Sequence, residues 1–379
     1  MMFSNWSYPT DIRFGEGRIE ELGSLLKIHD IMRPLIVTDP HLVSLTSTQS
    51  IIENISKNFF CDVFHDVNSN PTEKNLEAGL DIFTTGNHDG VIAIGGGSSL
   101  DIGKLIAFMA PQSRSVWDFE DVSDWWKRAQ WRSIRPIVAV PTTAGTGSEV
   151  GRASVLTNSV SKEKKIIFHP KILPSAVICD PILTATMPKN ITAGTGLDAL
   201  AHCVEAYCSP SYHPMSQGIA LEGTKLIKEN LLLVYEDGSD IVARSNMMTA
   251  ALMGAVGFQK GLGAVHALSH PIGALYNTHH GLTNAILLPH VLEFNYKNIV
   301  NKINSLSRYL NINNGFDGFL SFVKNLNKAL NIPINLSEIG VLEGDIDRIV
   351  EGALKDPSKN GNPVKLNAKN LKKLLISAI

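Results

Sequence analysis

The sequence predicts an α/β domain over residues 1–185 followed by an all-α domain over residues 186–379, and three observations carry this prediction. The chain has 379 residues, which is too long for one ordinary domain. Before about residue 180, short apolar runs that suit β-strands alternate with helical patterns, as is typical of an α/β domain. After Pro188 the β-branched runs disappear, and helical periodicity continues to the C-terminus. We place the boundary near residues 181–190.

Four short apolar runs are the expected strands of the first domain. They begin near Arg33, Asp89, Arg135 and Ser175. Their continuous apolar character is typical of strands that are buried on both faces of a parallel sheet. Helical patterns over residues 71–86 and 99–110 lie between these runs. The alternation predicts a doubly wound α/β sheet with helices on both sides.

The second domain is expected to consist of helices. The periodic stretches cover residues 191–208, 214–230, 239–257, 281–295, 298–310, 316–330, 343–354 and 367–378. No tandem repeat or low-complexity segment interrupts them. Consecutive helices with short connections pack against one another around an apolar core.

Composition and charge exclude several classes of protein. With 44% apolar and 18% charged residues, the chain is typical of a folded globular protein. The formal net charge is −2 and the charges are interspersed, so we expect no nucleic-acid partner and no basic membrane-binding segment. The cysteines lack CxxC spacing, and residues 1–15 lack the features of a signal peptide, so a reducing, cytoplasmic location is expected. No run of about 18 apolar residues indicates a membrane span.

Two glycine-containing turns follow predicted strands of the first domain. In the run GGGSSLD (residues 95–101), three glycines let a ligand approach the backbone, and the following helix offers free N–H groups to a pyrophosphate. In the run PTTAGTGSE (residues 141–149), hydroxyl side chains stand beside two glycines. Because α/β sheets bind ligands at the carboxyl ends of their strands, the pair predicts a dinucleotide site. The alternative is two unrelated surface turns.

Asp39 ends a third predicted strand. A carboxylate at the end of a strand in a dinucleotide-binding domain can bond ribose hydroxyls and repel a 2′-phosphate, which favours NAD over NADP. An ordinary turn aspartate that caps the next helix explains the residue equally well.

The second domain contains a cluster of potential metal ligands. Asp198 and His202 are four residues apart in a helical stretch, so both side chains project from one face of the helix. His266 and His270 repeat this spacing, and an adjacent pair of histidines follows within ten residues. One carboxylate with three imidazoles suits Fe(II) or Zn(II) and is a poor site for Mg²⁺ or Ca²⁺. The alternative is a set of unrelated core or surface histidines.

These residues resemble those of the iron-containing (group III) alcohol dehydrogenases. The resemblance covers nearly the whole chain, from Phe14-Gly15 and Asn70-Pro71-Thr72 through the two glycine-containing turns to the histidine-rich segments. It implies the architecture that this family shares with dehydroquinate synthase, a dinucleotide-binding α/β domain followed by a helical metal-binding domain. That architecture agrees with the prediction from the sequence pattern.

The resemblance also implies roles for individual residues. One divalent ion, usually iron in this family, would be held by Asp198, His202, His266 and His280. His279 would be a neighbour of the ion and not a ligand, and His270 would relay a proton near the nicotinamide. The implied cofactor contacts are Asp39, Asn70, Gly96, Gly97, Ser98, Asp101, Thr142, Thr143, Thr146 and Lys164. Lys165 is an alternative match for the last of these.

The activity that the resemblance implies is an NAD-dependent dehydrogenase that interconverts a small primary alcohol and its aldehyde. The ion, Fe(II) or alternatively Zn(II), would polarise the substrate oxygen while carbon exchanges hydride with NAD. The resemblance further implies a homodimer or a larger homo-oligomer.

The segment ahead of His266 departs from the family pattern, because Gln259 and Lys260 stand where many relatives have small or neutral residues. We therefore expect Phe258, Lys260 and Arg152 to lie near the substrate, and we hypothesise a small substrate that bears an anionic group. The alternative for Lys260 is a solvated surface lysine.

Three other functions are compatible with this architecture. A lyase of the dehydroquinate-synthase type uses NAD only transiently, but such sites carry additional Lys and Arg residues and lack the Asp-x-x-x-His spacing found here. A glycerol-dehydrogenase-like enzyme is the second. A non-catalytic dinucleotide-binding protein is the third, and the complete ligand set argues against it.

Overall fold

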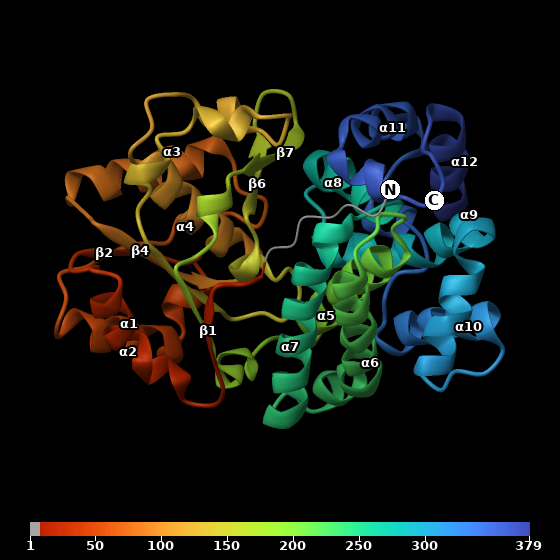
Figure 1. Ribbon diagram of the computed structural model, residues 1–379, viewed down its shortest axis with the longest axis horizontal. Coiled ribbons are helices and arrows are strands. Elements are labelled where there is room, and N and C mark those ends of the chain that lie inside the picture. Colours follow the sequence, from red (N-terminus) through yellow and green to blue (C-terminus); the bar gives the residue numbers. More distant parts are fainter. Residues whose placement is uncertain (1–7) are drawn as a thin grey trace. The chain divides into compact units, whose positions relative to one another are not determined.

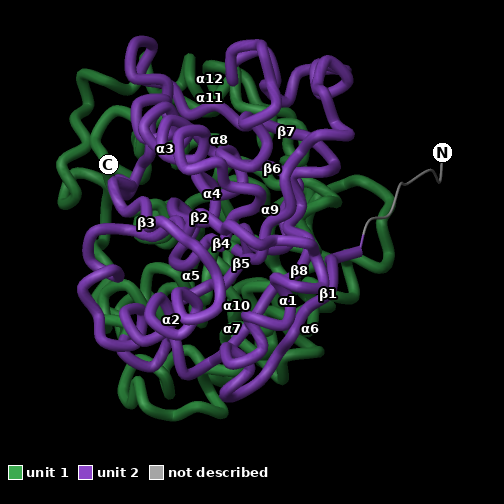
Figure 2. Tube along the Cα trace, turned by 90° about the vertical axis from the view of Figure 1, so that its left-hand side faces the viewer, with its two compact units in different colours: residues 1–7, 144–146, 187–379 green, residues 8–143, 147–186 purple. Residues whose placement is uncertain are grey.

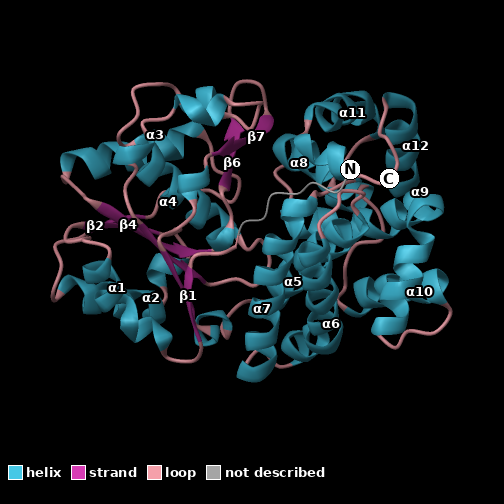
Figure 3. Ribbon diagram, in the orientation of Figure 1, coloured by secondary structure: helices cyan, strands magenta, loops and turns pink. Residues whose placement is uncertain are grey.

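The computed structural model describes residues 8–379, so part of the segment in which no signal peptide is expected lies outside the described residues. The chain divides into two compact units, which Figure 2 colours separately. The α/β unit comprises residues 8–143 and 147–186, and the helical unit comprises residues 144–146 and 187–379. Among the described residues, the strands all belong to the α/β unit (Figure 3). The predicted fold class, an α/β domain followed by a helical domain, is confirmed.

A parallel six-stranded sheet forms the centre of the α/β unit, with strand order β1-β8-β5-β4-β2-β3. The strands are β1 (Asp11–Phe14), β2 (Pro34–Val37), β3 (Asp62–Phe64), β4 (Gly90–Gly95), β5 (Ile137–Pro141) and β8 (Ala176–Cys179). The four predicted apolar runs form β2, β4, β5 and β8, and every residue of these strands is buried. The edge strands β1 and β3 are short and partly exposed, which explains why they lack the apolar signal.

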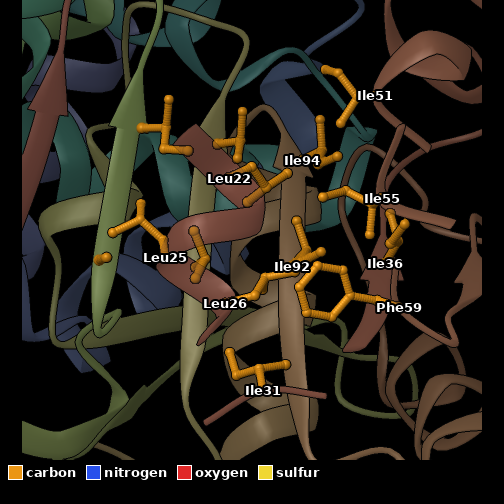
Figure 4. Close-up of a cluster of buried hydrophobic side chains, with 14 residues drawn as sticks. Leu22, Leu25, Leu26, Ile31, Ile36, Ile51, Ile55, Phe59, Ile92 and Ile94 are labelled. Carbon is orange, nitrogen blue, oxygen red and sulfur yellow. The ribbon is translucent and has the colours of Figure 1, made fainter. Parts of the chain in front are cut away.

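Helices cover both faces of the sheet. Figure 1 shows α1 (Leu22–Ile28) and α2 (Thr46–Ser56) on one side of it, and α3 (Glu73–Thr85) and α4 (Gly97–Met109) on the other. Successive side chains of a strand point to opposite faces. Ile92 and Ile94 of β4 accordingly join the cluster that α1 and α2 form, drawn in Figure 4. Ala93 instead faces α4. A Cβ added at Gly103 of that helix would lie 2.6 Å from the Cβ of Ala93.

The sheet changes winding direction between β2 and β4. From β2 the chain continues through α2 to the edge strand β3, whereas from β4 it continues through α4 to β5 on the other side. β2 and β4 are neighbours in parallel register, with Val37 opposite Ala93, so their carboxyl ends lie side by side. Open α/β sheets bind ligands at such a point. The fold therefore places the glycine-rich turn and Asp39 together at the expected cofactor edge.

A separate antiparallel hairpin, β6 (Ala153–Asn158) and β7 (Glu163–Phe168), belongs to the same unit. It is fastened to the start of α3, because Thr157 N donates to Pro71 O at 2.8 Å and Ser159 N donates to Glu73 Oε2 at 3.0 Å.

Eight α-helices are described in the helical unit. They are α5 (Lys189–Cys208), α6 (Pro214–Glu236), α7 (Ile241–Gly257), α8 (Ala264–Tyr276), α9 (His280–Tyr309), α10 (Gly315–Ala329), α11 (Ile346–Lys355) and α12 (Ala368–Ala378). Two details differ from the prediction. The stretches 281–295 and 298–310 form one continuous helix, and α8 is absent from the predicted set. Glycines precede α8 and Pro271 lies inside it, so its sequence signal is weak.

One segment, Ile241–Lys260, is long and apolar enough to cross a membrane by length and composition alone. It contains Arg244, Ser245 and Asn246, which is why it forms no continuous apolar run. Half of its most apolar window is buried inside the protein, where α7 packs against α5 and α6. A core helix passes the same test, so this segment is weak evidence for a membrane span.

Candidate functional site

The structure brings the four predicted metal ligands together within the helical unit. Asp198 and His202 lie one turn apart on α5, His266 lies in the first turn of α8, and His280 is the first residue of α9. The Nε2 atoms of His202, His266 and His280 lie 3.7, 3.8 and 3.7 Å from the same oxygen, Asp198 Oδ1. We call these four side chains the ligand cluster.

The distances in the ligand cluster fit a shared ion better than direct hydrogen bonds. A hydrogen bond between nitrogen and oxygen brings the atoms within about 3.2 Å. Two ligands bonded at about 2.1 Å to one tetrahedral ion stand about 3.4 Å apart. One carboxylate oxygen and three imidazole nitrogens are a donor set that Fe(II) and Zn(II) accept. The residues present therefore fit the metal that the family resemblance implies.

A glycine permits the close approach of α5 and α9. A Cβ added at Gly281 would overlap the carbonyl oxygen of Gly194 and would lie 3.1 Å from the Cβ of Asp198. Any side chain at position 281 would therefore push the first turn of α9 away from α5. Glycine keeps His280 within reach of Asp198.

Burial and mutual charge shift the pKa values of the cluster. Burial would raise the pKa of Asp198, but the neighbouring histidines lower it well below its usual range. Burial lowers the pKa of His202 to about 4. Burial would also lower the pKa of His266, but the neighbouring carboxylates of Asp198 and Glu205 raise it to about 9. The buried carboxylate of Asp198 thus stays ionised, which favours a cation beside it.

A second carboxylate supports His266 from behind. Glu205 Oε2 accepts a hydrogen bond from His266 Nδ1 at 2.6 Å, and Oε1 accepts one from Val265 N at 2.8 Å. A carboxylate bound to Nδ1 fixes the orientation of the ring and leaves Nε2 for a metal. Glu205 follows Asp198 by seven residues on α5, so both project from the same face of that helix.

His270, one turn after His266 on α8, pairs with a buried aspartate. Its Nδ1 lies 2.6 Å from Asp356 Oδ2. Because an ionised carboxylate can only accept, Nδ1 carries a proton, and in the neutral ring this leaves the lone pair on Nε2. The His270 ring stacks on His280, with centroids 5.3 Å apart and planes 14° apart, and lies edge-on to His266 at 5.9 Å. A potential base therefore stands beside two of the ligand rings.

Phe258 and His279 border the ligand cluster. Phe258 lies in the 3₁₀ turn Phe258–Lys260, and its ring centroid is 5.1 Å from that of His202. His279 precedes α9 as its N-cap, with Nδ1 accepting a hydrogen bond from Leu282 N at 3.3 Å. The structure thus uses the His279 ring to cap a helix, in agreement with the role of a neighbour.

The structure gives Lys260 a different role from both of those considered for it. Its side chain is buried, and its Nζ donates to the carbonyl oxygens of Ala206 and Tyr207 at 3.0 and 2.9 Å. These carbonyls end α5, where partners within the helix are missing and a cation is favourable. Lys302 donates to the carbonyls that follow. Lys260 is therefore a buried cap of α5, and its assignment to the substrate or to the solvated surface is corrected.

Lys260→Met is expected to lower stability without changing the preference among substrates. The substitution removes two hydrogen bonds and leaves the carbonyl of Ala206 without this donor, whereas Tyr207 O keeps a contact of 3.3 Å with Lys302 Nζ. The expected cost is about 1–3 kcal/mol. Denaturant unfolding measures the free energy, and kcat/KM ratios for 4-hydroxybutyrate and 1-butanol measure the preference. A selective loss on the charged substrate with unchanged stability would restore the substrate role.

Arg152 lies in the α/β unit, with its guanidinium 5.7 Å from the ring centroid of Phe168. A contact of Arg152 with the substrate stays a prediction.

The N-terminus of α4 is open at the carboxyl end of β4. Gly96 precedes the helix, Gly97 begins it, and no side chain caps it. A Cβ added at Gly96 would lie 3.3 Å from Thr143 Cγ2, so the glycine keeps the backbone accessible beside that threonine. Ser98 Oγ donates to Ser69 O at 2.6 Å. Free N–H groups and the positive end of the helix dipole make this terminus suitable for a pyrophosphate.

Asp39 follows β2 and caps the next turn with one oxygen. Oδ1 accepts hydrogen bonds from His41 N at 3.0 Å and from Leu42 N at 2.9 Å. The capping role considered for this residue is thus real. Both of these bonds use Oδ1, and a contact of Asp39 with the ribose of a cofactor stays a prediction.

The remaining cofactor candidates lie in different parts of the chain. Thr142 extends β5 by donating its N–H to Gly95 O at 3.0 Å, whereas Thr146 belongs to the short segment 144–146 that groups with the helical unit. Lys164 lies on β7 beside Lys165, whose Nζ is paired with Glu120 and Glu163. Cofactor contacts by these residues, and by Asn70 and Thr143, stay predictions.

Asp101 serves the interior of the α/β unit. Its Oδ1 accepts from Ser148 Oγ at 2.5 Å and lies 3.2 Å from Lys104 Nζ, and its Oδ2 accepts from Val155 N at 2.9 Å. These bonds fasten β6 and the turn after β5 to α4. Asp101 thus has a structural role in which both oxygens are engaged by the protein, and its direct contact with the cofactor stays a prediction.

Glu149→Gln is expected to remove a pH dependence of stability. Burial raises the pKa of Glu149 to about 7. The folded protein therefore keeps a proton that the unfolded chain has lost, and its stability falls as pH rises from about 4.5 to about 7. The variant should lack this fall and should gain about 1–3 kcal/mol at pH 8. Denaturant unfolding at pH 5 and pH 8 measures both quantities. The same pH dependence in both proteins would contradict the assignment.

Sequence reasoning missed several supports of the ligand cluster. Glu205 and Asn284 had a usable signal, because each stands at helical spacing from a ligand on its own helix. Asp356 and Asn362 had none. Asn362 Oδ1 accepts from Ala264 N at 3.1 Å and so caps α8 from 98 residues away.

Two family profiles match the sequence. Residues 9–181 match iron-containing alcohol dehydrogenase, and residues 192–379 match the C-terminal domain of the Fe-containing alcohol dehydrogenase family. The chain belongs to the iron-containing alcohol dehydrogenase family. The resemblance inferred from the sequence motifs is confirmed, and the chain is an oxidoreductase that acts on alcohols.

Three relatives of this alcohol dehydrogenase match over nearly their full length. A 4-hydroxybutyrate dehydrogenase from Cupriavidus necator is 35% identical over 378 residues, which are 97% of this chain and 98% of that one. The crystal structure of a 1,3-propanediol oxidoreductase has a TM-score of 0.93 at 32% identity and covers 100% of both chains. A sulfoacetaldehyde reductase from Bifidobacterium kashiwanohense, in complex with NAD⁺, has a TM-score of 0.89 at 26% identity and covers 100% of this chain and 99% of that one.

Proposed function

We propose that this alcohol dehydrogenase interconverts a small primary alcohol and its aldehyde with NAD and one divalent ion, Fe(II) or alternatively Zn(II). The observation that supports the proposal most is the geometry of the ligand cluster, in which three Nε2 atoms lie 3.7–3.8 Å from one carboxylate oxygen. The pair of His270 and Asp356 beside the cluster supplies a base for the same reaction.

The chain's own residues handle the proton of this reaction. When bound, the ion acts as a Lewis acid on the substrate oxygen and makes the alcohol more acidic. His270 Nε2, which keeps its lone pair because Asp356 holds the proton on Nδ1, accepts the proton that the alcohol loses. Asp356 then stabilises the imidazolium that forms. NAD, when bound, would supply the acceptor for the hydride of the substrate carbon. In the reverse direction His270 returns the proton to the forming alcohol.

The α/β unit supports NAD as the acceptor. The uncapped N-terminus of α4 suits the pyrophosphate, and the second oxygen of Asp39 suits the ribose. The same carboxylate would repel the 2′-phosphate of NADP. A related sulfoacetaldehyde reductase is known in complex with NAD⁺, which agrees with this choice.

The proposed substrate class is wider than the anionic substrates that we hypothesise from the sequence. With Lys260 buried at the end of α5, the hypothesis of an anionic substrate loses its main cation. The names of two relatives nevertheless include the anions 4-hydroxybutyrate and sulfoacetaldehyde, whereas 1,3-propanediol is neutral. We therefore propose small primary alcohols, charged or neutral.

An assay of net NADH formation tests the proposed function. The metal-free protein is loaded anaerobically with Fe(II) or Zn(II) and supplied with 1-butanol, 1,3-propanediol or 4-hydroxybutyrate. We expect NADH to accumulate with at least one alcohol. The reduction of NAD should be faster than the reduction of NADP under the same conditions. An enzyme that turns over without net NADH, as a lyase would, contradicts the proposal, and so does a protein inactive on every alcohol with either metal.

A further inference from the structure

Asn284 lies inside the ligand cluster without being one of the predicted ligands. It is fully buried on α9, one turn after His280. Its Nδ2 lies 2.7 Å from Asp198 Oδ1, 3.1 Å from His280 Nε2 and 3.3 Å from His266 Nε2. One amide nitrogen is therefore within hydrogen-bond distance of three of the four ligand atoms.

A carboxamide nitrogen carries two protons and can donate to two acceptors at once. The two shorter contacts of Asn284, to Asp198 and His280, use both. The carboxylate is an acceptor in any case, but His280 Nε2 accepts only when the ring proton is on Nδ1. Ser269 Oγ lies 3.5 Å from that Nδ1. In this tautomer the lone pair lies on Nε2, the atom that would bind a metal, and the ion takes that single lone pair over from the Asn284 N–H when it binds.

The contacts with the ligand atoms determine which end of the Asn284 amide faces the ligand cluster. Asn284 Oδ1 is buried and has no hydrogen-bond partner. An unpaired buried carbonyl is unfavourable. The flipped amide would be worse, because it would place Oδ1 against the carboxylate oxygen of Asp198 and the lone pair of His280. The N–H groups of Asn284 therefore point at the ligand cluster.

We propose that Asn284 is a positioning residue of the metal site. In the metal-free protein it joins Asp198 on α5 to His280 on α9 and keeps the lone pair of His280 on Nε2. When the ion takes that lone pair, the bond of Asn284 to Asp198 remains. The inference rests on the proposed metal-dependent function and adds to it a residue that orders the ligands before the ion arrives. Loss of such a supporting residue lowers metal affinity by about 10–100-fold.

The test measures the metal affinity of metal-free protein and not the activity of the loaded enzyme. Asn284→Leu keeps the volume of the side chain and removes its donors, and Asn284→Ala removes both. Asn327→Ala is the matched control, because Asn327 Nδ2 donates to Ala285 O at 2.7 Å and its Oδ1 is also buried without a partner. The dissociation constant for Zn(II) is measured by competition with a chromophoric chelator. Both Asn284 variants should bind about 10–100-fold more weakly than wild type, and Asn327→Ala should match wild type.

Several outcomes overturn the inference in different ways. Equal affinity of Asn284→Leu and wild type removes the hydrogen-bonding role. Weaker binding by Asn284→Ala alone assigns the residue to packing and equally overturns it. A wild-type protein that binds neither Zn(II) nor Fe(II) contradicts the proposed function, and the inference fails with it. Circular dichroism of the metal-free proteins verifies folding. If neither variant folds, Asn284→Ser, which retains one donor, replaces them and should show a smaller loss.

Discussion

His280→Ala is expected to lower kcat/KM by about 10³-fold and to reduce the metal content of the purified protein. The substitution removes one of the three imidazole nitrogens that lie within 3.8 Å of Asp198 Oδ1. A Lewis-acid ion contributes several kcal/mol to transition-state stabilisation, and each 1.4 kcal/mol corresponds to about a tenfold change in rate. Metal analysis of anaerobically purified protein and steady-state kinetics measure the two effects.

The adjacent histidine is the matched control for this prediction. His279→Ala removes the N-cap contact to Leu282 and should cost about 1 kcal/mol of stability. It should leave the metal content unchanged, because His279 is not in the ligand cluster. If His279→Ala lost the metal and His280→Ala kept it, the assignment of the fourth ligand would be reversed.

Asp356→Asn is expected to lower kcat by about 10²–10⁴-fold while the metal stays bound. Asparagine can still accept the hydrogen bond from Ser358 N that Asp356 Oδ1 accepts at 2.8 Å. Its Nδ2, however, would face His270 Nδ1 and force the ring proton onto Nε2. The nitrogen proposed to accept the proton of the alcohol would then be occupied. Stopped-flow and steady-state rates in H₂O and D₂O measure the loss and should show a larger solvent isotope effect.

Two controls accompany the Asp356 variant. Its melting temperature should stay close to that of wild type, since the cap of the following turn is preserved. Its metal content should also be unchanged, because Asp356 contacts only His270 among the histidines of this region. A kcat within about fivefold of wild type would show that His270 is not the base, or that its tautomer does not matter.

Local spacing made the ligand cluster predictable from the sequence. Asp198 and His202 are four residues apart and therefore share one face of a helix. This spacing can be read directly from the sequence. His280 could be chosen over His279 only through the family resemblance, because the two are adjacent and a sequence does not show which one precedes the helix as its cap. Asp356 carried no signal, since 86 residues separate it from His270.

Lys260 shows where sequence reasoning fails. In the sequence, a lysine close to a predicted metal ligand suggests a charged group near the substrate. The structure instead turns its side chain toward the end of α5, where unpaired carbonyls attract a cation. The position of a helix end relative to a residue more than 50 positions away depends on tertiary packing. The structural role of Asp101 also carries no signal in the sequence, because its partners Ser148 and Val155 come from later elements.

The fold was predictable from the sequence where complete burial requires a strand to be apolar throughout. The four central strands are buried throughout and carry a continuous apolar signal, whereas the edge strands β1 and β3 are partly exposed and lack that signal. In the helical unit, α8 escaped detection although it carries both His266 and His270. Its helix is set by packing and by caps from Glu205 and Asn362, which are distant in sequence.

The central claim is that the ligand cluster holds one divalent ion on which the dehydrogenase activity depends. An anaerobic titration of metal-free protein with Fe(II), followed by the initial rate of NADH formation, tests it most directly. The account predicts negligible activity without metal and a linear rise that ends at one equivalent of Fe(II) per chain. Full activity in the metal-free protein, or a rise that does not end at one equivalent, would contradict it.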